Sequence, residues 1–232
     1  PLHDNYGGLL QAFALKTTLE KLGHEVDLIN RRKDRISLKY RTIQFVKRLL
    51  AKGPNFELTK EQKEVISQHT NYFTRTYIKD ITPSIYDSAG LKRIASNYNA
   101  FIIGSDQVWR PAYSPKITNY YLDFVENPRT IGIAYAASFG VDNWEYSNEE
   151  TTICKKNVSK IIAVSVREDS GVELCKKYLG VDAVHVLDPT FLLSREEYIE
   201  LIKKENEKRS EGELMHYVLD SDGDKDALIN RV

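Results

Sequence analysis

The stretch Phe101 to Arg110, which reads FIIGSDQVWR, gives the clearest indication of the fold of this chain. Four apolar or small residues run into a Gly-Ser-Asp turn, which is how a buried parallel strand delivers its carboxyl end to a polar crevice. In this turn Asp106 can accept hydrogen bonds or act as a base, and Trp109 can offer a flat wall to a ligand. A second interpretation stays open, in which Asp106 caps a helix and Trp109 is an ordinary core residue.

Three further segments repeat this pattern of a buried strand followed by polar residues. They cover residues 130–138, 160–166 and 183–187. Parallel α/β sheets bind ligands outside the carboxyl ends of their strands, so all four polar ends are expected to converge on one site. The residues that this places at the site are Asp106, Ser138, Arg167 and Asp188.

Structural alternatives remain for two of these residues. Arg167 could pair with the neighbouring Glu168 or Asp169, and Asp188 could simply end its strand before Pro189. Each residue alone is weak evidence. It is the recurrence of polar residues at the same place in successive strands that favours a functional site.

The chain opens on a Gly-rich turn that leads into a helix. The turn contains Asn5, Gly7 and Gly8; the helical pattern ends at Gly23, and residues 25–30 predict a strand. A Gly-rich turn at a helix start normally follows a strand, so we expect a first strand to precede residue 1. The turn's backbone amides could meet a ligand, or it could be a plain tight turn with Gly7 or Gly8 at positive φ.

The alternation of strands and helices predicts an α/β domain over residues 1–190. Helical patterns cover residues 60–77, 87–98, 148–157 and 169–178. Residues 31–48 are strongly basic, and the apolar positions that follow Ile43 mark an amphipathic helix that ends near Gly53. Beyond Thr190 the chain predicts a Ser-capped helix over 194–204, a strand over 214–220 and a helix from 224. Because these few elements cannot bury a core, residues 191–232 are predicted to begin a second α/β domain that the sequence cuts short.

Composition narrows the classes of function. Among 232 residues, Lys plus Arg and Asp plus Glu both total 33, so the net charge does not indicate a partner such as nucleic acid. Cys154 and Cys175 fit no metal-ligand spacing, and we expect reduced thiols with a structural role, no metal and no cofactor. No apolar run approaches the ~20 residues of a membrane span, and no signal peptide is recognised, so a cytoplasmic protein is expected.

With these residues in view, the chain resembles the polysaccharide pyruvyl transferase family. The stretches that carry the resemblance are Asn5–Phe13, Ile103–Trp109, Tyr135–Gly140, Val164–Glu168 and Leu187–Thr190. They occur in the family's order and cover nearly the whole chain. The resemblance implies two Rossmann-like domains of the glycosyltransferase B type, which face each other across a cleft.

The resemblance also implies a reaction. Family members join the pyruvyl group of phosphoenolpyruvate, as a cyclic ketal, to two hydroxyls of a sugar in a cell-surface polysaccharide. Arg167 would hold the donor's phosphate or carboxylate, and Asp106 and Asp188 would orient or deprotonate the acceptor hydroxyls. The remaining residues expected to bind substrate are Asn5, Gly7 and Gly8 as the cleft floor, with Ser105, Ser138 and Trp109.

The sequence also departs from the family pattern. Family members carry a further His and a basic cluster in the second domain, where the general acid and donor-phosphate roles are assigned, and no such motif occurs before Val232. His216, on a predicted strand, does not look like a replacement, whereas His3 is a more suitable cleft residue. The fragment is therefore expected to be inactive or nearly so.

Two other functions stay open: a nucleotide-sugar glycosyltransferase of the same architecture, and a noncatalytic carbohydrate-binding component of a polysaccharide pathway. The expected partners are phosphoenolpyruvate and a sugar or lipid-linked oligosaccharide. The sequence does not indicate the acceptor sugar or the ketal linkage. It also leaves the oligomeric state open, and a homo-oligomer is one of the alternatives.

Overall fold

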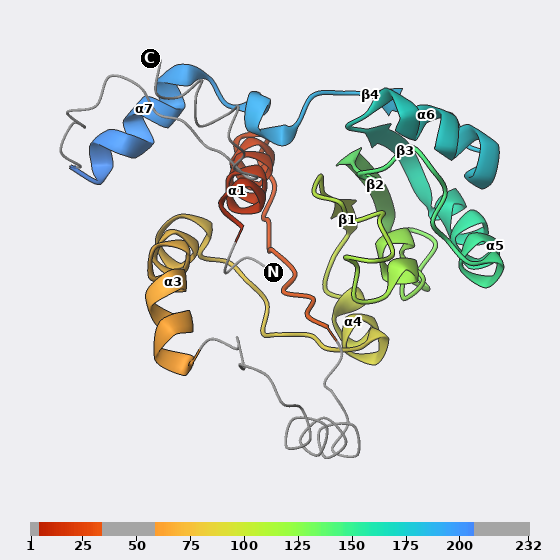
Figure 1. The fold of residues 1–232 in the computed structure, drawn as a ribbon, viewed down its shortest axis with the longest axis horizontal. Helices are drawn as coiled ribbons and strands as arrows, with labels where there is room; N and C mark the ends of the chain where they lie inside the picture. The colour runs from red at the N-terminus through yellow and green to blue at the C-terminus, as the bar shows by residue number, and fades with distance from the viewer. Residues whose placement is uncertain (1–4, 34–58, 207–232) are drawn as a thin grey trace, which may run out of the picture. The chain divides into compact units, whose positions relative to one another are not determined.

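The structure is a computed structural model that describes residues 5–33 and 59–206 (Figure 1). The chain divides into two units, Pro1–Leu193 and Ser194–Val232, and each is considered by itself. His3, His216, the amphipathic helix predicted to end near residue 53, the strand over 214–220 and the helix from 224 lie outside the described residues.

A four-stranded parallel sheet organises the first unit, with its strands in the order β1-β2-β3-β4. The strands are β1 (Ala100–Ile103), β2 (Ile131–Ala137), β3 (Ile161–Val166) and β4 (Val184–His185). Because every pair is parallel, the carboxyl ends of all four strands point the same way. The sheet confirms the α/β class and places the polar turns that follow the strands at one edge.

Two strand predictions were wrong in extent. Instead of a continuous strand, residues 25–30 form one isolated parallel bridge, Leu28 to Ile81, and the next residue forms another, Arg31 to Ile85. Between these bridges the partner segment carries Pro83, which has no N–H to donate. The side chain of Thr82 fills part of the gap, since its Oγ1 accepts a hydrogen bond from the backbone of Asn30 at 3.0 Å.

The strand predicted over residues 183–187 shortens to the two residues of β4. Its partner β3 ends at Val166, which pairs with His185. Beyond this pair one more backbone contact forms, from Val186 N to Val166 O at 3.0 Å. The chain then leaves the sheet toward Asp188.

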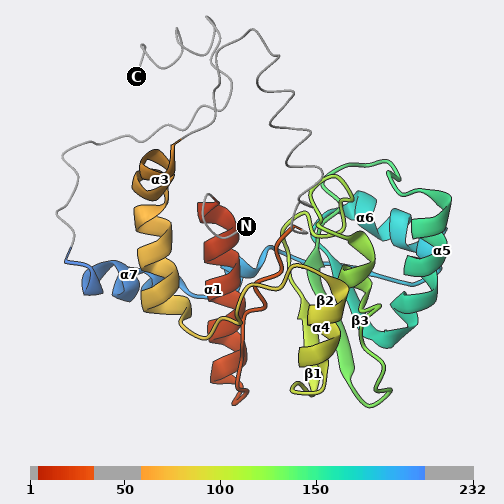
Figure 2. The same cartoon turned by 90° about the horizontal axis from the view of Figure 1, so that it is seen from below.

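The helices follow the local signals of the sequence closely. Their bounds are α1 (Tyr6–Lys21), α3 (Lys60–Phe73), α4 (Ser88–Ala95), α5 (Asn148–Asn157) and α6 (Asp169–Leu174). Thr59 and Ser147 close capping boxes, and Asp87 caps α4. In both views, which differ by a rotation of 90°, helices α5 and α6 lie on the same side of the sheet (Figure 1 and Figure 2). These helices supply part of the core and leave the strand ends to the loops.

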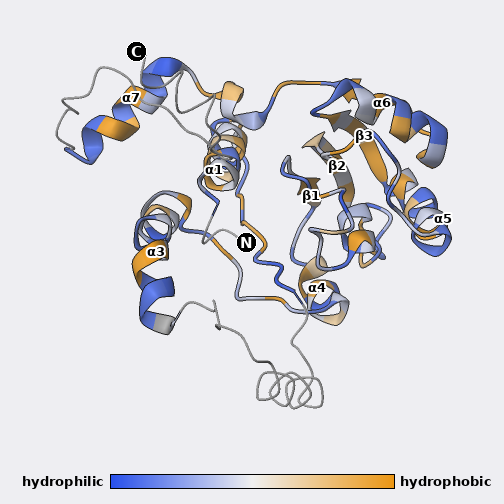
Figure 3. Cartoon of the chain, viewed as in Figure 1, coloured by the Kyte–Doolittle hydropathy of each residue, from blue (hydrophilic) through white to orange (hydrophobic). Residues whose placement is uncertain are grey.

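The core lies between the sheet and these helices. Trp109 and Tyr121 are fully buried, and their rings stack with centroids 5.0 Å apart. Cys154 and Cys175 are buried free thiols, and burial raises the pKa of each to about 12. Figure 3 shows β3 as hydrophobic and α5 as largely hydrophilic, as expected of a central strand and a surface helix.

In the second unit the structure describes α7 (Arg195–Lys204), which begins at the predicted Ser194 capping box. Among the described residues of the whole chain, no helix is long and apolar enough to cross a membrane.

Candidate functional site

The turn after β1 holds Asp106 against the first helix. Asp106 Oδ1 accepts a hydrogen bond from Gln107 N at 2.8 Å, and Oδ2 accepts one from Asn5 Nδ2 at 3.0 Å. Asn5 lies 101 residues away in sequence. Asp106 is exposed and begins no helix, so the capping interpretation does not hold here. Since a carboxylate can accept about four hydrogen bonds, Asp106 keeps acceptor capacity toward solvent.

Asn5 joins this turn to α1. Its Oδ1 accepts from Gly8 N at 2.9 Å, which makes Asn5 the N-cap of the helix. Gly7 and Gly8 are helical, so the interpretation that placed one of them at positive φ was wrong. A Cβ at Gly8 would lie 3.1 Å from Asn5 Nδ2, whereas one at Gly7 would lie 3.4 Å from Oδ1. Gly8 therefore leaves the room in which the Asn5 amide turns toward Asp106.

Asp188, which follows β4, is bonded on both oxygens. Its Oδ1 accepts from the Thr190 backbone at 3.0 Å and from the Thr190 hydroxyl at 2.9 Å. Its Oδ2 accepts from Gln11 Nε2 and from Arg167 Nη1, the latter at 3.1 Å. Burial alone would raise the pKa of Asp188, but the hydrogen bonds from Thr190, Gln11 and Arg167 together hold it below its ordinary value. Asp188 is thus a carboxylate whose acceptor positions are filled.

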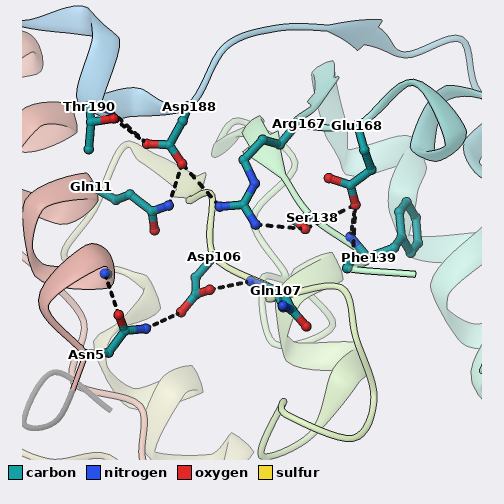
Figure 4. A network of polar contacts seen from close by, with 12 residues as sticks. Asn5, Gln11, Asp106, Gln107, Ser138, Phe139, Arg167, Glu168, Asp188 and Thr190 are labelled. Carbon is teal, nitrogen blue, oxygen red and sulfur yellow. Dashed lines mark hydrogen bonds and ion pairs between the residues drawn. The ribbon is translucent and has the colours of Figure 1, made fainter. Parts of the chain in front are cut away.

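Arg167 connects the ends of three strands (Figure 4). Besides its contact with Asp188, its Nη2 donates to Ser138 Oγ at 3.2 Å, and its backbone N donates to Ala137 O at 3.2 Å. The partner of Arg167 is therefore Asp188, and not Glu168 or Asp169 as the sequence also allowed. A guanidinium has five N–H groups, so two such bonds leave three without an acceptor among the described residues.

Glu168 secures the turn after β2. Its Oε1 accepts from Ser138 Oγ at 3.0 Å, from Phe139 N at 2.6 Å and from Gly140 N at 3.0 Å. Glu168 also occupies the N-cap position of α6 but makes no capping bond with its side chain. Its carboxylate serves the neighbouring strand end instead of its own helix.

Three residues expected to touch substrate are buried. Trp109 is 0%, Ser138 1% and Ser105 4% exposed. The Trp109 indole donates to Tyr120 O at 3.1 Å, so the structure matches the interpretation of Trp109 as core. Ser138 takes part in the site by linking Arg167 to Glu168.

Two phenols accompany the aspartates. The pKa of Tyr135 is raised by burial and then by the negative charge of Asp188. The pKa of Tyr120 is also raised, chiefly by burial; Arg31 lowers it and the charge of Asp106 raises it. Both phenols therefore stay protonated at neutral pH and can donate a hydrogen bond.

Sequence reasoning assigned no role to Gln11 or Glu168. Gln11 meets Asp188 across 177 residues, and nothing local to either residue signals that contact. Both Gln11 and Glu168 do lie in the stretches that carry the family resemblance, which is the signal that could have found them.

The network has an excess of negative charge. Its charged groups are Asp106, Arg167, Glu168 and Asp188. Among the described residues no group of three or more His, Cys, Asp or Glu is placed to hold a metal ion. A partly open hollow of about 530 Å³ lies elsewhere, lined by Asp123 and Lys160 among others. Lys160 precedes β3, so this hollow is at the amino ends of the strands, and we place the candidate site at the carboxyl ends.

Comparison with known proteins gives one match. The family model described as polysaccharide pyruvyl transferase matches residues 5–230, nearly the whole chain. No curated protein and no solved structure matches the chain. The matched range includes every residue of the network described above.

Proposed function

Because the chain belongs to the polysaccharide pyruvyl transferase family, we propose that it transfers the pyruvyl group of phosphoenolpyruvate to two hydroxyls of a sugar. The product is a cyclic ketal in a bacterial capsule or exopolysaccharide. The observation that carries the proposal is the convergence of Asp106, Arg167 and Asp188 with α1 at the carboxyl ends of the sheet. Such an edge is where parallel α/β folds bind their ligands.

The chemistry sets clear demands on the site. An acid protonates the methylene carbon of phosphoenolpyruvate, and the first sugar hydroxyl attacks the neighbouring carbon while a base takes its proton. The second hydroxyl then forms the other ketal bond as phosphate leaves, and the phosphate takes both the electron pair of the broken C–O bond and the proton of that hydroxyl. The enzyme must supply a base, an acid and groups that hold the donor's negative charges.

Asp106 is the better candidate for the base. It is exposed and accepts two hydrogen bonds from the described residues, so a sugar hydroxyl can reach it. Asp188 already accepts four, and its lowered pKa makes it a weaker proton acceptor. We assign proton removal to Asp106 and the orientation of Arg167 to Asp188.

Arg167 is the group we assign to the donor. Its planar fork suits a phosphate or carboxylate, and three of its N–H groups have no acceptor within the part of the chain that the structure describes. One guanidinium beside three carboxylates cannot balance the charge of phosphoenolpyruvate. We therefore propose that further cations, and the general acid, come from residues outside the described part of the chain.

The test uses the complete gene product with phosphoenolpyruvate and a panel of nitrophenyl or lipid-linked sugars. We expect phosphate release together with a product heavier by one pyruvyl ketal, measured by mass spectrometry. A folded protein that gives neither with any sugar would contradict the proposal. Binding of a uridine nucleotide in place of phosphoenolpyruvate would favour a glycosyltransferase.

Two arginine variants make the test specific. Arg167→Ala is expected to abolish phosphoenolpyruvate binding in a folded protein. Arg110→Ala is the control, because Arg110 forms an ion pair of similar exposure with Glu145, and its hydrogen bond to the side chain of Gln107, at 3.4 Å, does not involve Arg167. Equal donor affinity in the two variants would remove Arg167 from the donor site.

A further inference from the structure

The hydrogen-bond partners of Glu168 are unusual for a residue at the start of a helix. The residue before α6 normally satisfies the helix's own amides, and Ser, Thr, Asp or Asn does this best. Glu168 makes no such bond and directs one oxygen to the turn after β2, where it accepts three hydrogen bonds. Capping its own helix therefore does not account for this carboxylate.

The hydroxyl of Ser138 transmits the effect of that carboxylate. Ser138 is 1% exposed, and a hydroxyl has only one proton to donate. Because this proton goes to Glu168, the lone pairs of Ser138 Oγ are left to accept from Arg167 Nη2 at 3.2 Å. The order of donors is Arg167 to Ser138 to Glu168, and the negative charge at its end fixes the direction of each bond.

Arg167 is held at a second point as well. Its Nη1 donates to Asp188, so the two terminal nitrogens meet two acceptors from different strand ends. A planar group held at both ends has little rotational freedom, and its remaining N–H groups point in fixed directions. Preorganisation of this kind lowers the ordering cost that anion binding would otherwise carry.

We propose that Glu168 is a positioning residue that orients the guanidinium of Arg167 toward the anionic donor, acting through the hydroxyl of Ser138. This inference rests on the proposed function, because it takes Arg167 as the residue that binds phosphoenolpyruvate. Glu168 itself contacts neither substrate in this role. Its effect is expected in donor affinity and not in the affinity for the sugar.

The experiment is a double-mutant cycle with Glu168→Gln and Ser138→Ala in the complete gene product. Gln preserves the size of the side chain and removes its charge; Ala removes only the serine hydroxyl and leaves the Phe139 and Gly140 amides bonded to Glu168. We expect each single variant to weaken phosphoenolpyruvate binding about tenfold, and the double variant to bind no more weakly than either one. The sugar KM should not change.

Glu150→Gln is the matched control. One oxygen of Glu150 accepts from the backbone and the hydroxyl of Ser147, at 2.9 and 2.8 Å, so this substitution disturbs a similar serine–carboxylate contact outside the network. It should lower the melting temperature by about as much as Glu168→Gln and leave donor affinity at the wild-type value. A loss of donor affinity in Glu150→Gln would show a general effect of stability and overturn the proposal.

Two further outcomes would overturn it: wild-type donor affinity in Glu168→Gln, or losses in the two single variants that simply add in the double variant. Failure of the proposed function looks different, because the wild-type protein would then bind no phosphoenolpyruvate. In that case ¹⁵N relaxation of the Arg167 Nε–H group gives the readout. Order in the wild type that is lost in Glu168→Gln and Ser138→Ala supports the positioning role, and unchanged order contradicts it.

Discussion

Asp106 and Asp188 are the same residue type, and each follows a strand of the same sheet, yet their surroundings differ. Asp106 is exposed and accepts two hydrogen bonds, one from its neighbour and one from Asn5. The Asp188 side chain is 19% exposed and accepts four, one of them from a guanidinium. A place at the end of a strand brings a carboxylate to the site. The hydrogen bonds that the carboxylate accepts then determine whether it is available to a substrate or only orients a neighbouring side chain.

The largest expected effect comes from Asp106→Asn. Asn keeps the shape of the side chain but is not a base, so kcat should fall by roughly 10²–10⁴ while the melting temperature stays close to that of the wild type. Phosphate release from phosphoenolpyruvate in the presence of the acceptor measures this. If kcat stays at the wild-type value, Asp106 and Asp188 do not differ in the way proposed here.

Asp188→Asn should act on stability and its pH dependence. The pKa of Asp188 is lowered by folding, so its carboxylate stabilises the fold at pH values above the unfolded pKa of about 3.9. That contribution is lost as pH falls through the lower folded value. At neutral pH we expect the variant to be less stable by about 1–2 kcal/mol, and the difference from wild type should shrink as the pH falls below about 4.

Urea unfolding of both proteins across this range provides the measurement. A stability difference that stays constant from neutral to acidic pH would show that the charge of Asp188 is not what holds the turn. Asp106→Asn serves as the control, since it replaces an aspartate at another strand end and leaves the contacts of Asp188 in place.

The smallest effect is expected from the two glycines of α1. Ala at Gly8 would crowd the Asn5 amide and weaken its bond to Asp106, lowering kcat about fivefold, the equivalent of one hydrogen bond. Ala at Gly7 meets only an ordinary contact and should leave kcat unchanged. Either substitution favours the helix by up to about 1 kcal/mol, so a drop in kcat with Gly8→Ala cannot be attributed to unfolding. Equal kcat values for the two variants would separate Gly8 from the placement of Asn5.

Local signals in the sequence predicted most of the fold. Apolar runs marked β1, β2 and β3, and Ser194 marked a helix start with a complete capping box. Residues 25–30 failed as a strand because the pairing depends on a partner segment that contains Pro83. Strand pairing depends on a second segment that is distant in sequence, so one segment alone does not predict it. A capping box is formed by residues three positions apart and can be recognised locally.

The site was predictable to the level of strand ends and no further. The rule for parallel sheets brought Ser138, Arg167 and Asp188 together correctly in space. It could not tell that Ser138 is buried as a link or that Gln11 reaches Asp188, because burial and long-range hydrogen bonds leave no periodic pattern. Trp109 shows the same limit, since an aromatic residue beside a polar turn can face either the crevice or the core.

Helix α1 contacts both aspartates, through Asn5 at its N-cap and Gln11 within it. Six residue steps along the helix separate these contacts by about 9 Å along the axis, at a rotation fixed by about 100° per residue. The helix thus fixes the spacing of the two side chains, Asn5 and Gln11, that contact the carboxylates. Inserting or deleting one residue between Asn5 and Gln11 would turn one of them away from its aspartate, so the length of this segment is constrained as tightly as its chemistry.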